Sequence, residues 1–240
     1  MMKFGTEALA VANLNENGNY AVVTQWWARN GMNNPPEYAT GLMLTHVDAA
    51  AEAKQKAINK DSDGSASPYI PIDRYTLSYA PTTGFVSDLW SAFLTKMGVE
   101  SESVQGLRTQ MEGIQAGNRS VDWVAHSRGG PEFVQAASGS DMPELKKNSI
   151  VFHAGANNIA VTNYVMSQKK IGDAVDEENR FRDNSNDLVP QIVGLRALTS
   201  PWNFATSLIS APCLSSTFCS IQQSPHTLPA NWNRLAPEVE

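Results

Sequence analysis

Two apolar strand segments, each followed at once by a helical pattern, limit the folds open to this chain more than any other feature of its sequence. The segment SVDWVAH (120–126) precedes the helical pattern RGGPEFVQAASG (128–139), and SIVFHAGA (149–156) precedes VTNYVMSQKKIG (161–172). Strands that are apolar on both faces and alternate with helices are typical of a parallel sheet covered by helices. We therefore predict an α/β fold with a mostly parallel central sheet flanked by helices.

The neighbouring segments extend the same alternation. RYTLSYA (74–80) alternates like a strand, and NRFRDNSNDLVP (179–190) predicts a short strand that runs into a loop. Helices are predicted for SDLWSAFLTKMG (87–98), whose apolar residues share one stripe, and for SVQGLRTQMEGIQAG (103–117). These elements belong to the same predicted domain.

The first part of the chain has a less regular pattern. VDAAAEAKQKAINK (47–60) is rich in strong helix formers, whereas YAVVTQWWARNG (20–31) is compatible with a strand or a buried helix. The polar stretch DSDGSASP (61–68) is typical of a loop or a domain boundary. We therefore predict a partly helical N-terminal extension over 1–67 and an α/β domain over 68–240.

Composition and charge exclude some classes of function. The chain has 240 residues and a net charge of −6, which argues against a nucleic-acid partner because such a partner requires a basic face. The sequence has no apolar run long enough to span a bilayer, and it begins without the pattern of a signal peptide. The two cysteines, Cys213 and Cys219, fit a small disulfide loop or two separate thiols, and neither pattern implies a metal site.

Ser127 interrupts the transition from the strand SVDWVAH to the following helix. The simple interpretation is an ordinary strand-to-helix turn. The alternative is a nucleophile elbow, the sharp turn that presents a catalytic serine and needs small residues two positions before and after it. Ala125 and Gly129 occupy those two positions. In such an elbow the backbone N–H of Arg128 would face the developing oxyanion.

A catalytic serine needs a base and an acid that orients the base. In proteins that use such an elbow, the acid and then the histidine follow the serine along the chain. His226 lies on a Pro-flanked loop near the end of this chain. We favour Asp187, in NDLVP, as the acid and keep Asp183 as its alternative. His153 lies within a strand, where a core or supporting imidazole is the favoured interpretation.

The segments AHSRGG, NDLVP and SPHTLP resemble the three catalytic blocks of lipase-like α/β-hydrolases, over about residues 70–232. YAPTTGFVSDLW (79–90) resembles a segment of the C-terminal hydrolase domains found in large secreted polymorphic toxins. The chain departs from the lipase pattern in two ways. It is a reduced α/β-hydrolase-like pattern, because no full complement of early strands is visible before Arg74, and no His-Gly oxyanion motif follows its first clear strand. PTTGF (81–85) stands there, and Thr82 and Thr83 are the candidates for the second oxyanion donor.

The resemblance implies a serine hydrolase that cleaves carboxylic esters, with lipid or phospholipid acyl esters as substrates and transient contact with a membrane surface. It implies no metal and no organic cofactor. If the toxin resemblance holds, the domain is secreted or delivered into a target cell as part of a larger chain, and an immunity protein is its partner. The alternative from another class is a catalytically silent α/β module that binds a partner protein.

Overall fold

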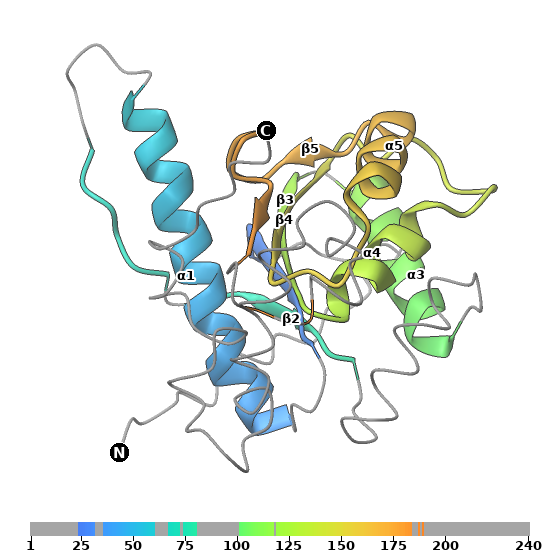
Figure 1. Ribbon diagram of the computed structural model, residues 1–240, viewed down its shortest axis with the longest axis horizontal. Helices are drawn as coiled ribbons and strands as arrows, with labels where there is room; N and C mark the ends of the chain where they lie inside the picture. Colours follow the sequence, from blue (N-terminus) through green and yellow to red (C-terminus); the bar gives the residue numbers. More distant parts are fainter. Residues whose placement is uncertain are drawn as a thin grey trace.

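The computed structural model describes residues 24–31, 36–60, 67–72, 74–80, 101–117 and 119–183, together with Asp187 and Val189. Its strands (Figure 1) are β1 (Trp26–Arg29), β2 (Thr76–Ser78), β3 (Val121–His126), β4 (Asn148–His153), β5 (Gly172–Asp173) and β6 (Phe181–Arg182). The helices are α1 (Pro36–Lys60), α3 (Glu102–Ala116), α4 (Gly129–Ala137) and α5 (Ile159–Lys169).

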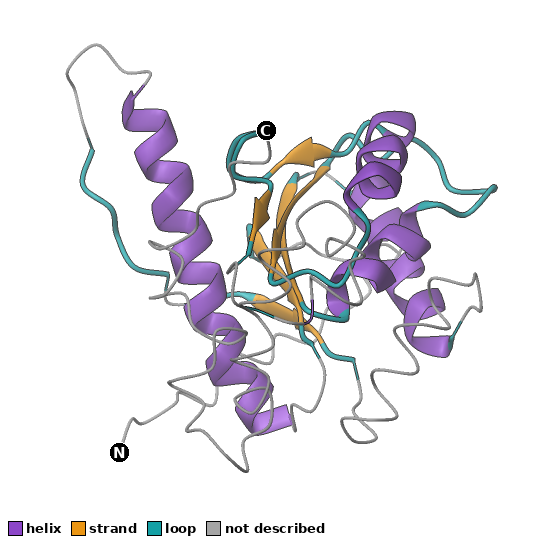
Figure 2. Ribbon diagram, viewed as in Figure 1, coloured by secondary structure: helices purple, strands orange, loops and turns teal. Residues whose placement is uncertain are grey.

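The strands form one sheet in the order β2-β1-β3-β4-β5, and every pairing among them is parallel. Figure 2 shows the sheet, in orange, with the long helix α1 on one side and the other helices on the other. β3 lies between β1 and β4, with Trp123 opposite Trp27 and His126 opposite His153. β5 pairs with the beginning of β4, and β6 pairs in parallel with its end. The predicted α/β fold with a mostly parallel, helix-flanked sheet is confirmed.

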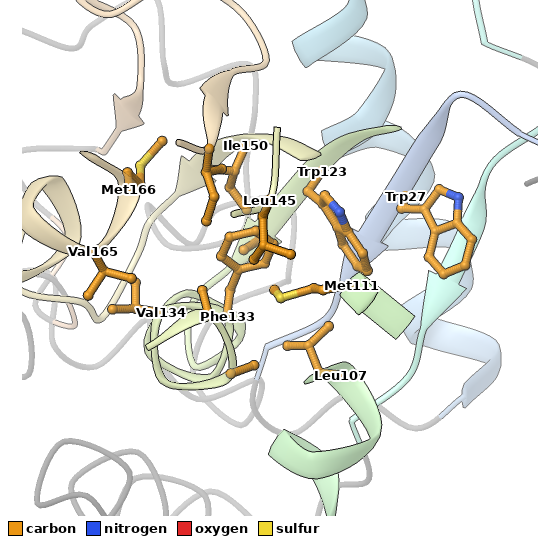
Figure 3. Packing of buried hydrophobic residues seen from close by; sticks show 14 of the residues in the cluster. Trp27, Leu107, Met111, Trp123, Phe133, Val134, Leu145, Ile150, Val165 and Met166 are labelled. Carbon is orange, nitrogen blue, oxygen red and sulfur yellow. The ribbon is translucent and has the colours of Figure 1, made fainter. Parts of the chain in front are cut away.

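Helices cover both faces of this sheet. α1 packs on one face, where Met43 and Val47 meet Val124 of β3 and Val151 of β4. α3, α4 and α5 pack on the other face, over the larger apolar cluster that includes Trp123 (Figure 3). Side chains of β3 alternate between the two clusters, as the two-residue period of a strand requires. A fully buried parallel strand therefore has apolar residues on both faces.

Two of the helices, α3 and α5, begin at residues whose side chains cap them. Ser101 caps α3 through its side chain, which accepts a hydrogen bond of 3.3 Å from the backbone N–H of Val104. The buried residues of α3 recur every three or four positions, at Val104, Leu107, Met111 and Ile114. Asn158 caps α5 in the same way. The helices predicted over 103–117, 128–139 and 161–172 correspond to α3, α4 and α5.

The strand order reverses between β1 and β3. From β1 the chain passes through α1 to β2 at one edge of the sheet, and it later crosses back to β3 and continues to β4 and β5. The helix after β1 and the helix after β3 thus lie on opposite faces. In open parallel sheets, ligands bind at the carboxyl ends of the strands where the order reverses. The turns after β1 and β3 meet at this place.

The N-terminal boundary predicted at 67/68 needs correction. β1 lies inside the sheet between β2 and β3, and α1 covers one of its faces, so neither belongs to an extension. The segment WWAR is only four residues long, which is too short for its pattern to separate a strand from a buried helix. The helix predicted over 87–98 lies outside the described residues. Within the described part of the chain, no helix has the length and apolarity needed to cross a membrane.

Candidate active site

Ser127 directly follows β3 at its carboxyl end, and Arg128 separates it from Gly129, the first residue of α4. Its backbone has a φ of +53°, in the left-handed region that residues with a Cβ rarely adopt. Such a conformation costs on the order of 1 kcal/mol for a residue other than glycine. Ala154, which directly follows β4, has a similar conformation with a φ of +48°. A serine held in a left-handed conformation directly after a strand is compatible with the predicted nucleophile elbow.

Backbone hydrogen bonds hold Ser127 in this conformation. Its N–H donates to the carbonyl of His153 (3.1 Å), and its carbonyl accepts from the N–H groups of Gly130 (3.0 Å) and Ala156 (3.2 Å). The side chain is fully buried, and its Oγ has no hydrogen-bond partner among the described residues. Backbone hydrogen bonds therefore satisfy the N–H and carbonyl groups of Ser127, whereas no described residue forms a hydrogen bond with its hydroxyl group.

The turn after β1 contacts the turn at Ser127 directly, a contact that the sequence does not predict. A Cβ added to Gly31 would lie 2.6 Å from the Cβ of Ser127 and 2.8 Å from Nδ1 of His126. Only glycine allows this approach, because real Cβ atoms do not come so close. The glycine at the end of WWARNG was visible in the sequence. Its contact with Ser127 was not, because that contact depends on the pairing of β1 with β3.

Asn30 joins this turn to the one that follows β2. Its side-chain amide donates to the carbonyl of Ala80 (2.9 Å), and its Oδ1 accepts from the N–H of Ala80 (2.6 Å). Ala80 is the last described residue before Thr82 and Thr83, which lie outside the described part of the chain. Their predicted contribution to an oxyanion site stays a prediction.

The two candidate acids have different surroundings. Asp183 directly follows β6, and its Oδ1 accepts a hydrogen bond of 3.1 Å from the N–H of Gly155 in the turn after β4. Asp187 is fully buried, and its Oδ1 accepts from the N–H of Val189 at 3.0 Å. A buried aspartate is uncommon, since a solvated surface position is the ordinary one for this residue. Asp183 thus supports a turn, whereas Asp187 is a carboxyl group held inside the protein.

The three histidines other than His226 form a buried cluster behind the elbow. His46 of α1 lies with its Nδ1 3.2 Å from Nδ1 of His153, and its ring centroid is 4.4 Å from that of His126. All are at most 1% exposed. Burial lowers the pKa of His153 well below its ordinary value, and the positive charge of Arg182 and the neighbouring His126 lower it further. The cluster connects α1 to the ends of β3 and β4.

His226 and the cysteines Cys213 and Cys219 lie outside the described residues, so their predicted roles stay predictions. No group of three or more histidine, cysteine, aspartate or glutamate side chains within the described residues is arranged to hold a metal ion. No family model, curated protein or solved structure matches this chain significantly. Any functional assignment therefore depends on the chemistry of the residues themselves.

Proposed function

We propose that this protein is a serine hydrolase that cleaves carboxylic esters, with Ser127 as nucleophile. The observation that carries the proposal is the left-handed backbone of Ser127 at the carboxyl end of β3. Strain of this kind persists only where the surrounding structure enforces it, and it is concentrated at functional sites. Its position, where the strand order reverses, is the place at which open α/β sheets bind ligands.

In the proposed reaction Ser127 Oγ attacks the acyl carbon of the ester, and the His226 imidazole accepts the hydroxyl proton. The tetrahedral intermediate then expels the alcohol, which takes that proton, and leaves an acyl-enzyme. Water attacks the acyl group by the same proton transfers and releases the acid. Asp187 orients the imidazole and stabilises its positive charge. Its burial supports this role over Asp183, whose carboxylate supports the turn at Gly155.

Two backbone segments are suited to stabilise the oxyanion. The N–H of Arg128 follows the nucleophile, at the start of α4. The close approach of Gly31 to Ser127 supports the turn after β1 as the source of a second donor, beside the prediction for Thr82 and Thr83. Donors fixed by the backbone before the reaction stabilise the developing charge without reorganisation.

Lipid or phospholipid acyl esters are the proposed substrates, by resemblance to lipase-like hydrolases. The apolar segment PWNFATSLISAPCLSSTF (201–218) precedes His226 and supplies the apolar side chains that an acyl chain requires. The toxin resemblance extends the proposal to a domain delivered into a target cell within a larger chain, opposed by an immunity protein. Contact with the membrane surface would then be transient.

Reaction with a fluorophosphonate probe tests the proposal, because only an activated serine displaces the fluoride. Ser127→Ala is expected to abolish labelling and the hydrolysis of p-nitrophenyl esters while leaving thermal unfolding nearly unchanged. Ser138→Ala, at the exposed far end of α4, is the matched control and should be labelled like the wild type. Wild-type protein that is neither labelled nor hydrolytic would favour the silent binding module. Hydrolysis that survives in Ser127→Ala would move the nucleophile elsewhere.

A further inference from the structure

Three charged side chains form a buried group beside the elbow, and none of these side chains has a role in the proposed reaction. Arg29 ends β1, Arg128 follows Ser127, and Glu132 lies in the first turn of α4. All three are at most 4% exposed. Nη2 and Nε of Arg29 lie 2.6 and 2.9 Å from Oε2 of Glu132, and Nε of Arg128 lies 3.1 Å from Oε1. One carboxylate is thus shared by two guanidinium groups.

Arg29 also reaches two other elements at this edge of the sheet. Its Nη1 donates to the side chain and the carbonyl of Ser78, at the end of β2, over 3.0 and 3.2 Å. Its Nη2 donates to the carbonyl (3.2 Å) and the hydroxyl of Ser103, at the start of α3. A single guanidinium therefore joins the end of β1 to β2, α3 and α4.

The same junction is packed tightly in its backbone. A Cβ added to Gly129, the first residue of α4, would lie 2.7 Å from the carbonyl oxygen of Arg29 and 3.0 Å from that of Asn30. The start of α4 thus contacts the backbone at which β1 ends. The ion pair between Arg29 and Glu132 joins the two segments that this contact brings together.

Stability alone does not account for such a group. Removing three charges from water costs several kcal/mol per ion, and apolar replacements of similar volume are often as stable or more stable. A carboxylate shared by two arginines does, however, fix the relative position of the two backbone segments that it joins. Those segments are the turn after β1, which contains Gly31, and the elbow, which contains the N–H of Arg128.

We propose that Arg29 and Glu132 are positioning residues that set the separation of the two turns from which the oxyanion donors come. The proposal rests on the proposed hydrolase function. Neither side chain needs to touch the substrate, since both act through the backbone they hold. A donor displaced by a fraction of an ångström loses much of its stabilisation of the transition state, while substrate binding is affected little.

The decisive variant replaces the whole group with apolar side chains, Arg29→Met with Arg128→Met and Glu132→Leu, so that no buried charge is left alone. Its midpoint of urea unfolding is expected to equal or exceed that of the wild type. Its kcat on a p-nitrophenyl ester should fall roughly 10- to 100-fold, with KM nearly unchanged. The inhibition constant of phenylboronic acid, which forms a tetrahedral anion on an activated serine, should rise by a similar factor.

Asp122→Asn is the matched control, because it changes another buried carboxylate, which pairs with the partly exposed Lys54 (2.6 Å) at the opposite end of β3. It should leave kcat and the affinity for the boronic acid unchanged. Glu132→Gln keeps the side-chain shape and gives a second measurement of the same quantities if the triple variant does not fold. An active wild type whose kcat and boronate affinity persist in the folded variants overturns the positioning role alone. A wild type that fails to react with fluorophosphonate overturns the hydrolase and, with it, this proposal.

Discussion

The left-handed backbone of Ser127 has a consequence for stability that needs no substrate to measure. Glycine adopts a positive φ freely, so Ser127→Gly should be more stable than Ser127→Ala by about 1 kcal/mol in the free energy of unfolding. At Ser138, where φ is −77°, the same comparison should have the opposite sign, because there glycine adds only chain entropy to the unfolded state. Urea unfolding of the glycine and alanine variants at both positions measures the two differences in stability. A glycine variant that is the less stable at both positions would contradict the strained elbow.

Single substitutions of Asp187 and Asp183 distinguish the two candidate acids. Asp187→Asn is expected to lower kcat by up to the order of 10⁴-fold, because the imidazole loses both its orientation and the charge that stabilises its protonated form. Asp183→Asn should have a mild effect, since an asparagine oxygen still accepts the hydrogen bond from Gly155. Steady-state kinetics of the two asparagine variants, compared at equal thermal stability, show which aspartate is the catalytic acid. A large loss in Asp183→Asn alone would transfer the role of the acid to Asp183.

At the scale of helices and strands, the sequence best predicted the elements that are determined by residues close together in the chain. β3 and β4 are apolar segments of strand length, and each is followed by a segment compatible with a helix, α4 or α5. β1 and the two-residue β5 are too short to show a period, and their pairing partners supply the missing constraint. The elbow pattern could be recognised because Ala125, Ser127 and Gly129 occupy alternate positions of one short segment. The contact of Gly31 with Ser127 and the buried ion pair of Arg29 with Glu132 join residues about a hundred positions apart.

The histidine cluster connects three elements and makes their packing sensitive to acid. The pKa of His153 is lowered in the folded protein from an ordinary value of 6.5, chiefly by burial, so below that pH the unfolded chain binds a proton that the folded one does not. Stability is therefore fully present above about pH 6.5 and is lost as the pH falls, by at most about 1.4 kcal/mol per pH unit for this one proton. Urea unfolding between about pH 7 and about pH 5 is expected to show this slope.

His153→Leu is the variant that tests the origin of the slope. It removes the titrating group, so its stability should depend less steeply on pH than that of the wild type, whatever its absolute value. His46 and His126 remain, and Arg182 still donates from Nη1 to the carbonyl of Ala49 on α1. Equal slopes in the two proteins would show that the acid sensitivity arises from other groups.

At the scale of the whole molecule, the position of β1 within the sheet indicates which residues the fold requires. β3 pairs with β1 along four residues, and β2 pairs with β1. β1 also supplies Trp27, whose ring centroid is 5.2 Å from that of Trp123 in the larger core. α1 covers the opposite face of the sheet. Residues before the predicted boundary at 67/68 therefore contribute to both apolar clusters and to the turn that contacts Ser127.

A chain truncated to residues 68–240 provides the last test. It lacks β1 and α1, so β2 loses its partner, one edge of β3 becomes unpaired, and Val124 and Val151 lose the helix that covers them. Because an exposed strand edge and an uncovered apolar face both favour association, the truncated chain should aggregate. It should also lack the cooperative urea transition and the near-ultraviolet circular dichroism of the full chain, since packing of the tryptophans at the core depends on β1. A soluble 68–240 chain with native-like spectra and reaction at Ser127 would instead restore residues 1–67 as a separate extension. That result would also remove Gly31 from the candidate active site.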